Sequence, residues 1–108
     1  MTNKWRPAKW VLLRYYLKNN STFDRLLVSS QSRYTEQEGW RLSEALQSAK
    51  YNGYEISFRT QDGEVYECRP DREGMTELTE SVLPEIKHEA SLIHGASVSV
   101  IDYAGEEK

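Results

Sequence analysis

Cysteine is nearly absent from this chain, and long apolar runs are missing altogether. Its 108 residues contain one cysteine, Cys68. A lone cysteine excludes an internal disulfide and a cysteine-based zinc site, and it fits a reducing compartment. The longest apolar run, Trp10–Leu13, is far shorter than the roughly 18 residues that a membrane-spanning helix needs. We therefore expect a cytoplasmic protein that does not cross a membrane.

Basic residues are concentrated in the first third of the chain. Residues 1–34 hold seven basic residues against a single acid, Asp24, a net charge of +6. Residues 35–108 hold seven basic residues against sixteen acids, a net charge of −9, so the whole chain carries −3. Any polyanion would therefore meet the first third, and any basic partner would meet the remainder.

The stretch Tyr54–Arg69 has the clearest local pattern, that of a β-hairpin. Apolar and polar residues alternate on both sides of an Asp-Gly turn. A two-residue loop would place charges opposite apolar residues, whereas a three-residue loop ending at a left-handed Gly63 places apolar residues opposite each other. We therefore predict the register that pairs Phe58 with Tyr66 and Ile56 with Cys68.

Two earlier apolar segments, residues 8–17 and 23–30, are open to a strand or a helix interpretation. Their β-branched and aromatic residues favour strands. Ser21, three residues before Asp24, resembles a helix-capping box instead. We predict an N-terminal hairpin of Lys9–Leu17 with Arg25–Ser30.

A first helix is predicted over Thr35–Tyr51. Thr35 and Glu38 match a capping box, and apolar residues recur at helical spacing from Leu42 onward. Asn52-Gly53 would end this helix.

A second helix is predicted between Asp71, as its N-cap, and Gly95, as its C-cap. Pro84 lacks an N–H group, so the helix is expected to kink or restart there. The alternating residues Ser97–Tyr103 then predict a last strand.

From Arg25 onward the predicted order is β-α-β-β-α-β. This is the ferredoxin-like arrangement of an α+β fold, an antiparallel sheet with two helices on one face, here with an extra N-terminal strand or helix. The length predicts one domain over residues 1–108, with a flexible lead at 1–7 and an acidic tail at 104–108. The predicted core residues are Leu42, Leu46, Ile56, Phe58, Tyr66, Cys68, Leu78, Val82, Ile86, Ile93, Val98 and Val100.

The basic, aromatic N-terminal third is a candidate for binding nucleic acid. Lysine and arginine contact phosphates, and aromatic rings offer faces for base stacking. The alternative is that these aromatic residues are core, their commoner use, with Trp5 as the exception because it precedes any regular element. The candidate contacts are Lys4, Trp5, Arg6, Lys9, Arg14 and Lys18.

A winged-helix interpretation would use helices at 8–18, 22–30 and 36–51, with the hairpin as the wing. The third helix would enter the DNA groove, yet it begins with Glu36 and Glu38, whose carboxylates would be repelled by phosphate. A sheet-based surface is the other form of the nucleic-acid hypothesis.

Acidic residues recur along the second predicted helix and form a candidate surface for a protein partner. A run of this kind is usually a solvated face, but it also fits a basic partner. The candidates are Glu73, Glu77, Glu80, Glu85 and Glu89. Our leading hypothesis is a small, non-enzymatic binding or regulatory protein that acts through protein–protein contacts. An edge strand at residues 97–103 would also allow a homodimer by sheet extension.

Residues able to carry catalysis do not form a catalytic pattern. His88 and His94 are six residues apart and do not share a helix face. Cys68 in mid-strand is more simply a small core residue. No glycine-rich phosphate loop is present in the sequence. We therefore predict no catalytic residue, no cofactor and no metal site, and we rank a small-molecule enzyme third.

Overall fold

Two four-stranded sheets and one α-helix make up residues 4–31 and 38–103, the part of the chain that this computed structural model describes. Sheet A has the strand order β1 (Lys4–Trp5), β7 (Val65–Cys68), β6 (Ile56–Thr60) and β5 (Leu46–Tyr51). Sheet B has the strand order β4 (Glu38–Leu42), β3 (Thr22–Gln31), β2 (Lys9–Tyr16) and β8 (Ser97–Ile101). Neighbouring strands are antiparallel except β1 and β7, which are parallel.

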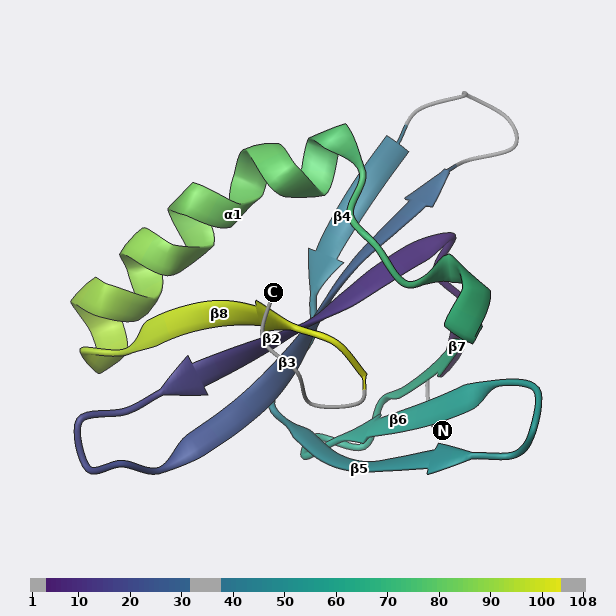
Figure 1. Ribbon diagram of the computed structural model, residues 1–108, viewed down its shortest axis with the longest axis horizontal. Coiled ribbons are helices and arrows are strands. Elements are labelled where there is room, and N and C mark those ends of the chain that lie inside the picture. Colours follow the sequence, from purple (N-terminus) through teal and green to yellow (C-terminus); the bar gives the residue numbers. More distant parts are fainter. Residues whose placement is uncertain (1–3, 32–37, 104–108) are drawn as a thin grey trace.

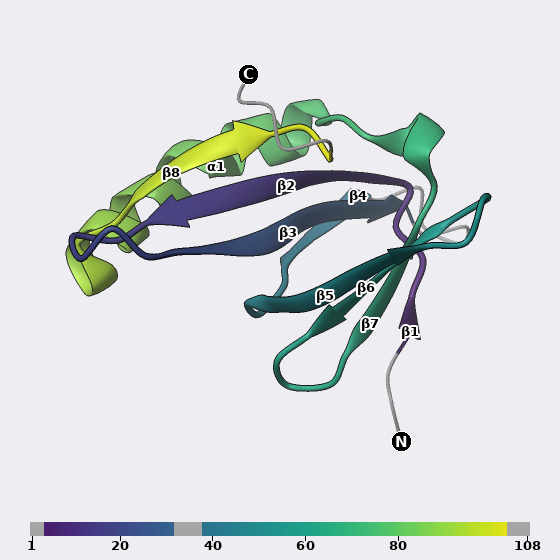
Figure 2. The same ribbon diagram turned by 60° about the horizontal axis from the view of Figure 1, so that its bottom comes forward.

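These elements stack in three layers, which Figures 1 and 2 show from two directions. Helix α1 (Glu77–Glu89), continued by the π-helical turn Ala90–His94, covers one face of sheet B. Sheet A packs against the opposite face of sheet B. Sheet B is therefore the middle layer.

Strand β2 lies between two separate cores. Its residues alternate between the two faces of the sheet. On the helix side lie Val11, Leu13 and Tyr15, with Leu27 of β3 and Ile86 of the helix. On the side of sheet A lie Trp10 and Leu12, with Leu26, Val28, Ile56, Phe58, Tyr66, Cys68 and Ile101. The strand interpretation of residues 8–17, with both faces covered, is confirmed.

The ferredoxin-like α+β prediction is wrong, because the described chain has eight strands and a single α-helix. The error lies in the predicted helix Thr35–Tyr51: β4 and β5 occupy this segment on either side of a connection at residues 43–45. Thr35 itself lies outside the described residues. The winged-helix alternative is wrong for the same reason, since residues 9–16 and 22–31 are also strands.

Long-range pairing explains why residues 38–51 are not helical. Ser43 is buried and forms two hydrogen bonds with Leu26. The Ser43 N–H donates to the Leu26 carbonyl at 2.8 Å, and the Leu26 N–H donates to Ser43 Oγ at 2.8 Å. Strand β4 then pairs with β3, and β5 pairs with β6. These ladders outweigh a helical spacing of apolar residues that is weak in itself.

Both predicted hairpins are confirmed. Strands β2 and β3 pair antiparallel. In the second hairpin Phe58 lies opposite Tyr66 and Ile56 opposite Cys68, and Gly63 has a φ of +92° in the three-residue loop. Within the segment predicted as a flexible lead, Lys4–Trp5 pairs with β7 as β1. The acidic tail at 104–108 lies outside the described residues.

The second predicted helix is present but begins later. Its N-cap is Thr76, which forms a capping box with Thr79, whereas Asp71 lies in a 3-10 turn, Pro70–Arg72. The helix continues through Pro84 and does not restart. Pro84 and Glu80 are both exposed, so water can solvate the Glu80 carbonyl that lacks its usual donor. Gly95 ends the helical segment at a φ of +61°, as predicted.

Most of the predicted core is buried or half-buried, with one clear exception. Ile93 is 69% exposed on the π-helical turn. Most of the buried residues that are absent from the predicted core belong to β2 and β3. The sequence pattern did not decide between strand and helix for these two segments. The predicted last strand is present as β8, and it is an edge of sheet B.

Phe58 tests the packing between the two sheets. It is 1% exposed and tilts against Trp10 with ring centroids 5.4 Å apart. We expect Phe58→Ala to lower the free energy of unfolding by about 3–5 kcal/mol, measured by denaturant titration. The neighbouring exposed Arg59→Ala is the control, with an expected change within about 0.5 kcal/mol. Equal effects of the two substitutions would contradict this packing.

Candidate functional site

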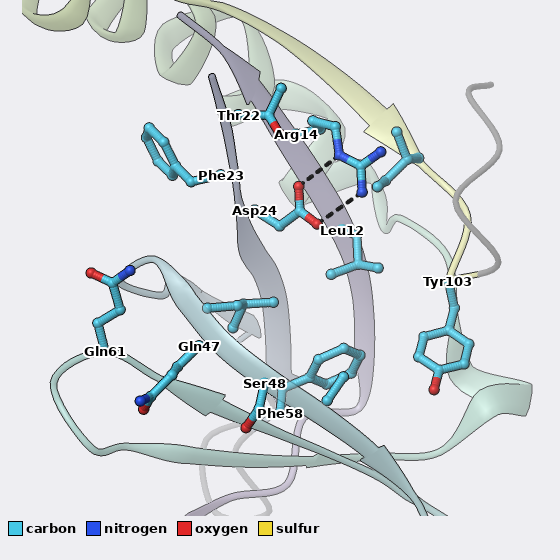
Figure 3. A pocket seen from close by; sticks show the side chains of 13 residues that line it. Leu12, Arg14, Thr22, Phe23, Asp24, Gln47, Ser48, Phe58, Gln61 and Tyr103 are labelled. Carbon is cyan, nitrogen blue, oxygen red and sulfur yellow. Dashed lines mark hydrogen bonds and ion pairs between the residues drawn. The ribbon is translucent and has the colours of Figure 1, made fainter. Parts of the chain in front are cut away.

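One concavity is a cleft between the two sheets, shown in Figure 3. It has a volume of about 410 Å³ and lies between β5 of sheet A and strands β2, β3 and β8 of sheet B. Its apolar lining includes Leu12, Phe58 and Ile101. Polar side chains surround this apolar part: Arg14, Thr22, Asp24, Gln47, Ser48 and Gln61. The cleft thus combines an apolar floor with hydrogen-bonding groups, as binding sites commonly do.

Arg14 and Asp24 form an ion pair on the sheet B wall of the cleft. They lie opposite each other in the β2–β3 register. The Arg14 guanidinium donates to both carboxylate oxygens, at 2.8 Å and 3.0 Å, the two dashed lines in Figure 3. The hydrogen bond to Asp24 is the main cause that raises the pKa of Arg14. The predicted phosphate contact Arg14 is therefore already neutralised by its neighbour.

Tyr103 closes one end of the cleft. Its ring meets Phe58 edge-on, with centroids 6.0 Å apart. Its backbone N–H donates to the Glu73 carboxylate at 2.8 Å. Glu73, a predicted protein contact, precedes helix α1 and instead anchors the chain after β8.

Strand β5 forms an open edge along the cleft. The Asn52 N–H donates to the Glu55 carbonyl at 3.1 Å, so these two residues are a hydrogen-bonded pair. Hydrogen-bonded and non-hydrogen-bonded pairs alternate in an antiparallel ladder. The N–H and C=O groups of Ala49 and Tyr51 therefore point away from β6, and no other described strand pairs with β5.

A β-bulge makes part of this edge irregular and so less able to pair with another strand. The register of β5 shifts between Leu46 and Ser48, which leaves Gln47 without a partner opposite it on β6. Bulges and charged side chains such as Lys50 are devices that limit unwanted pairing at sheet edges. The edge from Ser48 to Tyr51 is regular.

Trp5 belongs to a packed cluster and not to a free stacking surface. Its ring stacks on Tyr66, with centroids 6.2 Å apart, and the Arg41 guanidinium lies 4.4 Å from its ring centroid. The Trp5 indole N–H donates to Glu64 at 3.0 Å. Arg41 also donates to the Tyr66 hydroxyl and to Glu64. Trp5 is nevertheless 37% exposed.

The remaining candidate contacts for nucleic acid do not share one surface with Trp5. Arg6 pairs with Glu67 at 3.1 Å on sheet A. Lys9 begins β2, and Lys18 follows β2 and lies against Gly95. Trp10 is buried, and its indole N–H donates to the Arg69 carbonyl at 2.8 Å. The core alternative for Trp10 and Tyr15 is confirmed.

Basic side chains do gather on the outer face of sheet A, which faces away from sheet B. Phe58 and Tyr66 point inward, so the residues beside them point outward. By the strand registers, this outward set includes Lys4, Arg6, Lys50 and Arg59. Lys50 and Arg59 were missed because β5 was predicted to be helical and Arg59 was considered only as a strand residue.

A second concavity, the Trp40 groove, lies on the helix side of sheet B. It has a volume of about 480 Å³ and is lined by Trp40 of β4 together with Pro84, Glu85, Ile86, His88 and Glu89 of α1. Glu85 and Glu89 were predicted protein contacts, and both lie here. Glu77 and Glu80 are in the first turn of the helix and do not line this groove.

Cys68 is fully buried beside Ile56. Burial raises the pKa of its thiol, and the nearby Glu55 carboxylate adds to the increase. A neutral thiol is a poor nucleophile and a poor metal ligand. In residues 4–31 and 38–103, no three histidine, cysteine or acidic side chains are grouped to hold a metal ion.

None of the helical structure in the described ranges is long and apolar enough to cross a bilayer. Comparison of the chain with protein-family models, with curated proteins and with solved structures finds no match.

The buried thiol gives a direct test of this packing. We expect Cys68 to resist modification by a thiol-specific disulfide reagent at pH 8 in the native protein and to react fully once guanidinium unfolds the chain, because only the exposed thiolate attacks the reagent. The measurement is the rate of chromophore release. Rapid labelling of the native protein would contradict the buried position.

Proposed function

We propose that this chain is a small, non-enzymatic binding protein that takes up an extended segment of a partner protein at the open edge of β5. The observation that carries the proposal is the coincidence of this edge with the inter-sheet cleft: Gln47, Ser48 and Ala49 belong to β5 and also line the cleft. An added strand would hydrogen-bond to the edge, which is a common mode of peptide recognition.

The cleft supplies the contacts that a bare edge lacks. Every second side chain of an added strand would point toward sheet B, where Leu12 and Ile101 offer apolar contact. The amide of Gln61 and the hydroxyl of Thr22 can hydrogen-bond to polar groups of the incoming segment. Backbone pairing would supply affinity, and these side chains would supply selectivity.

The lone, buried Cys68 suits a reducing interior. We infer the cytoplasm as the compartment in which the partner is met.

Proline at position 49 tests the edge contact. Ala49→Pro removes the outward N–H without removing a hydrogen bond to β6, and proline is tolerated on edge strands. Peptides selected from a phage-displayed library of random ten-residue sequences should bind the parent protein. We expect their dissociation constants to rise at least about five-fold for Ala49→Pro, the loss of roughly one hydrogen bond.

Ala49→Val is the matched control, because it changes the side chain and keeps the N–H group. It should bind the selected peptides like the parent, and circular dichroism should show both variants folded. Failure to enrich any peptide, or equal binding by Ala49→Pro, would refute the proposal. A homodimer that Ala49→Pro converts to a monomer would show that a second copy of the chain occupies the edge instead.

The second candidate function is polyanion binding on the outer face of sheet A. It is favoured by the basic residues on that face, and among the described residues neither Lys50 nor Arg59 forms an ion pair. Tyr54 adds an aromatic ring beside the sheet, and the Arg69 guanidinium lies 5.4 Å from the centroid of that ring.

Salt dependence distinguishes this candidate. If the face binds single-stranded oligonucleotides, the double substitution Lys50→Gln/Arg59→Gln should lower the slope of log affinity against log salt by about 1.4, roughly 0.7 for each phosphate that is no longer neutralised. Lys18→Gln/Lys87→Gln makes the same charge change away from sheet A and should leave the slope unaltered. Fluorescence anisotropy measures both. No binding at low salt would remove the candidate.

A further inference from the structure

We propose that the Trp40 groove binds an arginine or lysine side chain of a partner protein. This inference rests on the proposed function only in taking the partner to be a protein. It concerns a different surface, because the groove and strand β5 lie on opposite sides of sheet B.

Trp40 offers an uncovered aromatic face. It lies opposite Ser29 in the β3–β4 ladder, two residues from Leu42, so it points to the helix side of sheet B. Its strand is an edge of that sheet. Trp40 is 44% exposed, although Ile86 and Pro84 of the helix provide an apolar floor beside it. An exposed indole in an apolar groove is typical of a contact surface.

Two carboxylates flank this aromatic face. Glu85 and Glu89 are one turn apart on α1, so they share a side of the helix. Neither forms an ion pair with any cation in the described ranges. Like charges at this spacing repel and weaken a helix slightly. A bound cation would remove that repulsion, so the pair is suited to receive one.

An arginine or lysine side chain matches this combination. Its aliphatic stem can lie on Ile86 and Pro84, and its charged end can lie over the Trp40 ring. The two carboxylates can then accept its N–H donors. A bare metal ion fits less well, because an indole offers it no ligand. The groove volume of about 480 Å³ leaves ample room for one such side chain.

The probe is N-acetyl-arginine amide, titrated while the indole N–H resonance of Trp40 is followed by NMR. Trp40→Phe assigns that resonance among the three tryptophans of the chain. We expect a saturable shift in the millimolar range. N-acetyl-citrulline amide has nearly the same shape without the charge, and it should cause little shift. Equal shifts with the two compounds would overturn the proposal.

Charge-matched variants localise the effect. Glu85→Gln/Glu89→Gln should raise the dissociation constant of the probe about five-fold or more, as expected for the loss of two exposed ion pairs. Glu77→Gln/Glu80→Gln removes the same charge from the same helix outside the groove, and it should change the constant less than about two-fold. Equal losses in the two variants would mean general charge attraction and would refute the site.

Two further measurements show whether the weaker binding comes from unfolding or from the β5 edge rather than from the groove. The thermal midpoint of Glu85→Gln/Glu89→Gln should equal or exceed that of the parent, because a like-charge repulsion is removed. Ala49→Pro should leave the arginine titration unchanged. A negative result in the peptide-binding test at the β5 edge therefore does not contradict arginine binding in the Trp40 groove. A negative arginine titration likewise does not contradict peptide binding at the β5 edge.

Discussion

Strand β2 carries buried apolar side chains on both of its faces, and the architecture follows from covering them. Trp10 and Leu12 require an apolar layer on one side, and Leu13 and Tyr15 require one on the other. Burying side chains of this size contributes about 1.5–3 kcal/mol each, so neither face can be left exposed without a large loss of stability. Sheet A covers one face and helix α1 covers the other. Three layers are the minimum that satisfies this single strand.

Local chemistry predicted the features that short-range signals determine. Gly63 and Gly95 were identified as left-handed positions, and the hairpin register followed from keeping charge off the apolar face. The helix over residues 35–51 was predicted wrongly because Leu42 and Leu46 happen to have helical spacing. The deciding interaction is between Ser43 and Leu26, seventeen residues apart, and no local pattern contains it.

The candidate sites were predicted only in part, for the same reason. Glu85 and Glu89 were found from their helix, but Trp40 was assigned to the wrong element, so the groove that joins them was missed. Arg14 was considered as a phosphate contact without its partner. The signal for Asp24 was available, since an extended β2–β3 hairpin centred near Asn19 places the two residues opposite each other. The β5 edge could not be found while β5 was considered helical.

The late position of β8 in the sequence affects how the chain folds during synthesis. Strand β8 pairs with β2, and Leu12 lies opposite Ile101. On a ribosome that adds residues from the N-terminus, that side of the β2 ladder stays unpaired until Ile101 has been added. Contacts so distant in sequence slow folding, and uncovered apolar strands promote aggregation during the delay. The interval between the synthesis of β2 and that of β8 is therefore the one in which the nascent chain is most exposed to aggregation.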